Sequence, residues 1–253
     1  MLTRTLMATL TGMNTRAEHA GFACGPPLSH PELLKLQTWF SPSFPIGSFS
    51  YSHGLEWVVE TQGVRDAGSL AAWVGGVLRH GAGRSDAILL CATWRAVAKE
   101  DWLGATEIGS LAAALQPSLE GRLESLAQGA AFLRAVEAGW PDPVSARFQE
   151  RCPGEVAYPV AVGAAAAAHG LPLDLMLVAF LHAFAANLVS AGVRLVPLGQ
   201  TDGLKVIAAL EPTLLEVAHE AYSAKLDEVG SASFLADIAS MRHETQYTRL
   251  FRS

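Results

Sequence analysis

The eight histidines of the chain are its first candidates for metal or acid–base chemistry, but their spacing does not favour it. Helical zinc hydrolases place two histidines four residues apart, with a glutamate between them. No two histidines here have that spacing. A metal-dependent hydrolase is therefore the less favoured of two alternative functions for this protein; the other alternative is given below. His182 lies in an apolar stretch that favours a buried structural histidine, and His53 has no second ligand at metal spacing. We therefore predict no metal ligand and no cofactor.

Motifs for nucleophilic or phosphate chemistry are also missing. The sequence contains no G-x-S-x-G nucleophile elbow. Residues 199–205 (GQTDGLK) resemble a phosphate-binding loop, but the two glycines are one residue too close and Lys205 does not directly follow the second glycine. We predict no catalytic residue, and we expect that the protein is not an enzyme.

The C-terminal segment 241–253 (MRHETQYTRLFRS) differs from the rest of the chain in charge and composition. It carries three arginines against Glu244 alone, whereas the remaining residues include 15 basic and 23 acidic side chains. Tyr247 and Phe251 share a face if the segment is helical, and arginine with aromatic residues is typical of interface hot spots. Two interpretations stay open: a docking segment, or a frayed basic tail of the kind common at chain ends.

The overall composition narrows the class of partner. Only 17% of residues are charged and the formal net charge is −6, which argues against nucleic acid and against an anionic membrane surface. Residues 175–193 carry no formal charge, but the stripe of Ala179, Ala183 and Ala186 favours a packed core helix over a membrane span. Three cysteines without C-x-x-C spacing indicate no disulfide framework and a reducing, cytoplasmic location.

Periodicity of three to four residues, caps and breakers predict helices almost throughout. The expected helices cover residues 31–40, 52–62, 66–80, 85–99, 101–115, 118–138, 156–169, 174–193, 202–210, 212–228 and 233–241. Residues 139–154 are rich in proline and glycine and are expected to form a loop with at most a short helix around Arg147. The sequence thus predicts an all-α fold, a single-domain bundle of roughly ten helices over residues 31–253. Residues 1–30 are interpreted as a flexible N-terminal extension.

Three stretches together resemble the family of the urease accessory protein UreF: residues 41–56 (SPSFPIGSFSYSHGLE), 193–203 (VRLVPLGQTDG) and 240–253. Together with the predicted helices between these stretches, the resemblance covers about residues 31–253. It implies an all-α, non-enzymatic homodimeric scaffold. Its implied partners are the accessory protein UreD (also called UreH), the GTPase UreG and apo-urease, into which the assembly inserts nickel. Regulation of the GTPase activity of UreG is the nearest alternative role.

The resemblance also implies partner-binding residues in all three stretches. In the C-terminal segment, expected to dock on UreD, they are Arg242, His243, Glu244, Tyr247, Arg249, Leu250, Phe251 and Arg252. In the second stretch and just beyond it they are Arg194, Gln200, Asp202 and Lys205, for which a purely structural role stays open. In the first stretch they are Phe44, Tyr51 and Glu56, which are equally compatible with core packing.

Overall fold

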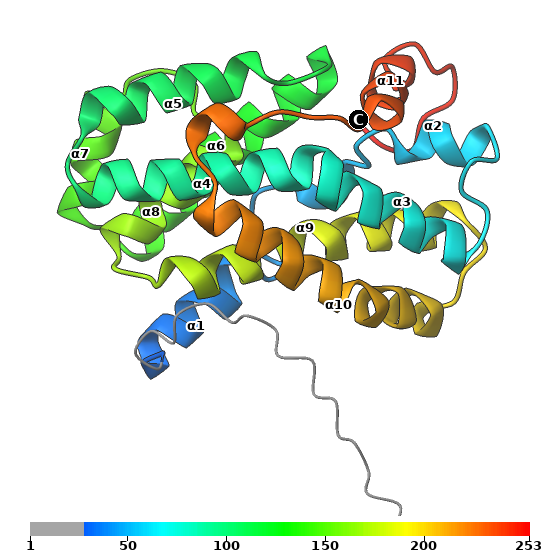
Figure 1. Cartoon of the computed structure of the whole chain (residues 1–253), viewed down its shortest axis with the longest axis horizontal. Coiled ribbons are helices and arrows are strands. Elements are labelled where there is room, and N and C mark those ends of the chain that lie inside the picture. Colours follow the sequence, from blue (N-terminus) through cyan, green and yellow to red (C-terminus); the bar gives the residue numbers. More distant parts are fainter. Residues whose placement is uncertain (1–27) are drawn as a thin grey trace, which may run out of the picture.

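The computed structural model describes residues 28–253, and this part of the chain is an all-α bundle of eleven α-helices and two short 3-10 turns, with no strand (Figure 1). The first half contains α1 (His30–Trp39), η1 (Ser48–Ser50), α2 (Leu55–Glu60), α3 (Ala67–His80), α4 (Ala82–Ala98) and α5 (Trp102–Ala114). The second half contains α6 (Leu119–Gly139), α7 (Pro143–Arg151), α8 (Tyr158–Ala168), α9 (Leu173–Leu195), α10 (Gln200–Ser223), η2 (Leu226–Glu228) and α11 (Phe234–His243). The predicted all-α, single-domain fold is confirmed.

The proposed extension over residues 1–30 lies mostly outside the described residues. Its last residues belong to the start of α1, where the Ser29 side chain accepts a hydrogen bond from the Glu32 amide and the Glu32 carboxylate accepts one from the Ser29 amide. Such a capping box satisfies two backbone donors that the first helical turn leaves free.

The core is centred on α8 and α9. Helix α8 packs on α4 so closely that a Cβ on Gly163 would lie 2.6 Å from the backbone oxygen of Leu90, which only glycine allows. Helix α9 is long and apolar enough to cross a membrane by length and composition. It packs against α2, α3, α4 and α10 instead, and its side chains Met176, Leu181 and Leu188 are fully buried. Helix α9 is therefore a packed core helix of the bundle, as predicted, but its alanine stripe is not the packed side. Ala179, Ala183 and Ala186 are half-buried, and His182, which was predicted to be buried, is exposed.

Helices α2, α7 and α10 differ most from the sequence expectation, and α4 begins at Ala82, three residues earlier than predicted. Helix α10 runs unbroken through Pro212, although an interior proline costs about 3 kcal/mol. Leu210, Leu214 and Val217 on either side are buried, and each contributes roughly 1.5–3 kcal/mol, which offsets that cost. Helix α7 is a full nine-residue helix, because Asp142 accepts hydrogen bonds from the amides of residues 144 and 145 and caps it.

Helix α2 starts three residues later than predicted. His53 and Gly54 both have a positive φ, which a helix does not admit. A Cβ on Gly54 would lie 2.6 Å from the backbone nitrogen of Ser240, so this glycine lets α2 and α11 touch through their backbones. The turn before α2 and the end of α11 are thereby fixed to each other.

Candidate functional site

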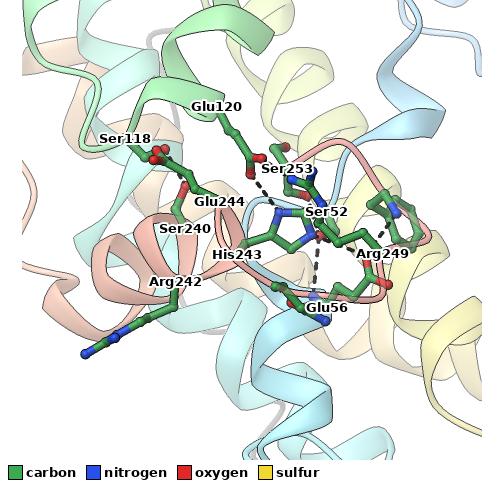
Figure 2. Close-up of polar contacts among 12 residues, drawn as sticks. Ser52, Glu56, Ser118, Glu120, Ser240, Arg242, His243, Glu244, Arg249 and Ser253 are labelled. Carbon is green, nitrogen blue, oxygen red and sulfur yellow. Dashed lines mark hydrogen bonds and ion pairs between the residues drawn. The ribbon is translucent and has the colours of Figure 1, made fainter.

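The C-terminal residues after α11 fold back onto the bundle and lie between α2 and the start of α6 (Figures 1 and 2). Helix α11 is joined to α6 at two points. Ser240 Oγ lies 2.6 Å from Ser118 Oγ, and the Glu244 carboxylate accepts a hydrogen bond of 2.7 Å from the amide of Leu119. A carboxylate at a helix N-terminus is favoured by the helix dipole. We call residues 244–253 the tail.

His243, the last residue of α11, lies fully buried between two carboxylates (Figure 2). Its Nδ1 is 2.7 Å from Glu120 Oε2 and its Nε2 is 3.2 Å from Glu56 Oε2. Both distances are hydrogen bonds only when both ring nitrogens carry a proton, because a carboxylate only accepts. Arg249 of the tail pairs with the other oxygen of Glu120, so two acidic and two basic groups meet here.

Glu56 also holds the tail through its backbone. Its Oε1 accepts a hydrogen bond of 2.6 Å from the amide of Leu250, and its Oε2 accepts one of 2.9 Å from the amide of Phe251. Charge-assisted hydrogen bonds to a carboxylate are about twice as strong as neutral ones. The buried Glu56 side chain is thus the main anchor of the tail. We call Glu56, Glu120, His243 and Arg249, with the two amides, the clasp.

The end of the tail is fixed separately. The Ser253 hydroxyl donates to Glu124 at 2.6 Å, and the Ser253 carbonyl accepts from the amide of Ser52 at 2.7 Å. The amide of Arg252 donates to the carbonyl of Ser50 at 2.8 Å. The tail therefore bonds at several places to the segment 50–56, which belongs to the first family-like stretch.

Arg194 connects all three family-like stretches. Its guanidinium carbon lies 3.7 Å from the ring centre of Phe49 and 4.4 Å from that of Phe251, and its Nη1 donates to the Phe49 carbonyl at 2.9 Å. Partial burial lowers the pKa of Arg194 from its usual value. Cation–π contacts of this kind contribute about 0.5–2 kcal/mol each, so Arg194 stabilises the docked position of Phe251.

The remaining predicted residues fall into two groups. Four residues at the end of α11 and in the tail have exposed side chains: Arg242, Tyr247, Leu250 and Arg252. Three others lie away from the clasp, at the start of α10: Gln200, Asp202 and Lys205. Arg242 points away from the clasp in Figure 2, and Lys205 pairs only with Asp202 in the first turn of α10. In contrast, Phe44 is buried against Phe132, and Phe251 is buried under Arg194. The Tyr51 carbonyl accepts a hydrogen bond from Asn187. Partner contact by any of these residues stays a prediction.

Helix α11 and the tail expose a group of large apolar side chains on the outside of the bundle. These residues, which we call the α11–tail surface, are Phe234, Leu235, Ile238, Met241, Tyr247 and Leu250. Tyr247 is fully exposed, and Leu235 and Phe234 are 73% and 69% exposed. Phe234, Ile238 and Met241 recur at helical spacing, so they share one side of α11. Exposed apolar side chains grouped on neighbouring segments are typical of a protein-binding surface.

Next to the clasp lies a cavity of about 250 Å³ whose polar lining sequence reasoning missed. His53 Nε2 is 3.1 Å from Glu124 Oε1. Burial would lower the pKa of His53, but the charge and hydrogen bond of Glu124 raise it overall. Burial also raises the pKa of the Asp86 carboxyl to about 7. Within residues 28–253, no three His, Cys, Asp or Glu side chains are arranged to hold a metal ion.

The acidic residues that organise the tail were also missed. Glu120 and Glu124 lie four residues apart in α6, and therefore on one face of that helix. Glu124 is buried and Glu120 is half-buried, and carboxylates removed from water need cationic or donor partners. The four-residue spacing of the two glutamates was the one local signal for this site. Their partners His243 and Ser253 lie more than 120 residues away in the sequence.

Comparison with known proteins places the chain in a family. The family model described as UreF matches residues 64–211. A protein of Rhodopseudomonas palustris strain BisB5 named urease accessory protein UreF is 53% identical over 221 residues, which cover 87% of this chain and 91% of that protein. One of Xanthobacter autotrophicus with the same name is 52% identical over 237 residues, covering 94% and 96%. A Bradyrhizobium protein of that name is 50% identical over 226 residues, covering 89% and 94%. The resemblance seen in the sequence is confirmed: the chain belongs to the UreF family of urease accessory proteins.

Proposed function

We propose that this protein is a non-enzymatic scaffold that binds UreD (UreH) through the α11–tail surface and recruits UreG for nickel insertion into apo-urease. The observation that carries the proposal is the clasp. It fixes a short tail against the bundle while Tyr247 and Leu250 stay directed outward. A fixed apolar surface loses less conformational entropy on binding than a flexible one, so it favours a stable complex.

The scaffold is further proposed to act as a homodimer in the cytoplasm. Cys91 and Cys152 are both free and buried, as expected of a protein in a reducing compartment. Light scattering on the purified protein measures the oligomeric state directly. A monomer at micromolar concentration contradicts the dimer.

The docking proposal is tested with point variants rather than with a truncation. Removing the tail also removes the buried Phe251 and the hydrogen bonds to Glu56. Loss of UreD binding by a truncated protein would therefore have two explanations, a lost contact with the partner or a disturbed bundle. Tyr247→Ala with Leu250→Ala removes two outward side chains and leaves the clasp intact. Co-purification with UreD is expected to fall at least tenfold. Leu103→Ala, an equally exposed leucine of α5, serves as the matched control. Unchanged co-purification of the double variant contradicts docking at this surface.

A regulator of UreG is the second candidate role. An arginine that acts on a GTPase must reach the nucleotide of its partner. Arg194 is already enclosed by two aromatic rings and bonded to the Phe49 carbonyl, so it is poorly placed for that contact, whereas Lys205 is exposed. The rate of GTP hydrolysis by UreG, measured with and without stoichiometric scaffold, decides between the roles. An unchanged rate rejects regulation.

A further inference from the structure

The cavity beside the clasp has aromatic walls. Its volume is about 250 Å³, and the rings of Phe40, Tyr158, Phe180 and Phe184 line it. The ring centre of Phe180 lies 5.7 Å from that of Tyr158 and 6.4 Å from that of Phe40, so these rings form one continuous wall. Sites for small molecules are apolar pockets of this kind, in which a few polar groups fix the orientation of the ligand.

Two carboxyl groups, those of Glu124 and Asp86, also line the cavity. Glu124 has its partners within the protein. It lies 3.1 Å from His53 Nε2, and it accepts hydrogen bonds of 2.8 Å from the Gln128 side-chain amide and of 2.6 Å from the Ser253 hydroxyl. The protein itself therefore supplies Glu124 with donors.

The Asp86 carboxyl group has no such partner. No side chain or backbone amide of residues 28–253 donates a hydrogen bond to it. In the same part of the chain no lysine or arginine lines the cavity, and the exposed His182, which does line it, pairs with neither carboxylate. Burial raises the pKa of Asp86 to about 7, with His53 opposing that shift and Glu124 adding to it. Because a carboxyl group removed from bulk water is costly without a donor, this site favours a cationic donor from outside the chain.

The walls of the cavity determine which class of cation fits. The His, Cys, Asp and Glu side chains of residues 28–253 form no group of three that could hold a metal ion. Aromatic faces attract organic cations, and their apolar surface buries a hydrocarbon body. We propose that the cavity binds a small organic ammonium ion, whose N–H groups donate to Asp86 and whose hydrocarbon body packs against the aromatic wall. The volume lies below the roughly 300–1,000 Å³ of sites for drug-sized ligands, which restricts the ligand to a small amine.

This inference goes beyond the proposed function and does not depend on it. None of the six side chains of the α11–tail surface lines the cavity. Binding of an amine is therefore measured on the protein alone, and its failure leaves the docking proposal untouched.

The test is calorimetric titration of the full chain with benzylammonium at about pH 8, where the amine is charged and most of Asp86 is ionised. Benzyl alcohol, which has the same ring and no charge, is the comparison ligand. Saturable binding of benzylammonium to a single site is expected, and benzyl alcohol should bind at least about tenfold more weakly. Equal affinity for the two ligands overturns the proposal, as does the absence of saturable binding.

Asp86→Asn is the decisive variant, because it removes the charge and keeps the size of the side chain. The affinity for benzylammonium is expected to fall at least about tenfold, while the affinity for benzyl alcohol changes less than about twofold. Asp237→Asn is the matched control, since burial also raises the pKa of Asp237 but this residue does not line the cavity. It should bind benzylammonium like the wild type. An unchanged affinity in Asp86→Asn overturns the proposal, and so does an equal loss in Asp237→Asn.

Two further measurements determine the place and the class of the ligand. Addition of benzylammonium is expected to shift the backbone NMR signals of Asp86, Tyr158 and Phe180, which line the cavity. Shifts confined to α11 and the tail place the amine elsewhere and overturn the proposal. Magnesium chloride should displace benzylammonium no better than sodium chloride of the same ionic strength. Stronger displacement by magnesium indicates a site for an inorganic cation and also overturns the proposal.

Discussion

Glu56→Ala is the perturbation that most directly tests how the tail is held. Glu56 accepts three hydrogen bonds in the structure, from His243 and from the amides of Leu250 and Phe251. Hydrogen bonds to a charged group contribute about 1.5–3 kcal/mol each. The free energy lost with all three bonds is larger than the stabilisation that the rest of the ten-residue tail provides, since Phe251 is its one buried aromatic side chain. We therefore expect the tail to detach locally while the bundle stays folded.

The magnitude follows from that local opening. Breaking one side of a buried ionic group costs about 3–5 kcal/mol, which corresponds to a factor of at least 100 in an equilibrium constant. Hydrogen exchange at the amides of Leu250 and Phe251 should therefore accelerate at least 100-fold. The exchange rates of amides in the middle of α8 and α9 should change less than about threefold, because the hydrogen bonds of the Glu56 side chain go to His243, Leu250 and Phe251 and not to these helices.

The matched control is Glu60→Ala, which removes an exposed glutamate from the same helix. It should leave exchange in the tail unchanged, since surface substitutions usually alter stability by less than about 0.5 kcal/mol. The reasoning is refuted if Glu56→Ala leaves Leu250 and Phe251 as protected as they are in the wild type. It is also refuted if α8 and α9 lose protection to the same extent as the tail.

Two further predictions concern the bundle. Gly163→Val should lower the midpoint of thermal unfolding by several degrees and stability by about 2 kcal/mol or more, because its Cβ would lie 2.6 Å from the Leu90 oxygen; an unchanged midpoint in calorimetry contradicts that close approach. Asp86→Asn should stabilise the protein at pH 8 by on the order of 3 kcal/mol, because burial raises the pKa of Asp86 to about 7 and folding then opposes its ionisation. The gain should be absent below about pH 4, grow as pH rises and level off above about pH 7, and a gain in denaturant unfolding that is independent of pH would contradict it.

Local signals predicted most of the helices. Asp66 and Ser118 each accept a hydrogen bond from a first-turn amide, and each lies at the start of a helix that the sequence predicts. Where burial outweighed a local signal, the prediction was wrong. The sequence predicts a helix boundary at Pro212, but the buried side chains on both sides keep α10 continuous.

The candidate site could be predicted only in part. The unusual composition of the C-terminal segment indicated that it mattered, and the family resemblance gave it a partner. The clasp could not be predicted from the sequence, because Glu56 and His243 are 187 residues apart. No local sequence pattern links a carboxylate in one short helix to an imidazole in another. The same residue types that suggest docking on a partner, an arginine and aromatic side chains, also serve to dock the tail on its own bundle.

The central claim, that the α11–tail surface docks on UreD, is tested most directly by hydroxyl-radical footprinting of the protein alone and in complex with UreD. We predict that labelling of the exposed side chains Phe234, Leu235 and Tyr247 falls at least threefold in the complex, while labelling of Leu103 on α5 stays the same. If these three side chains are labelled equally in both states while another face of the bundle becomes protected, UreD binds elsewhere and the account is contradicted.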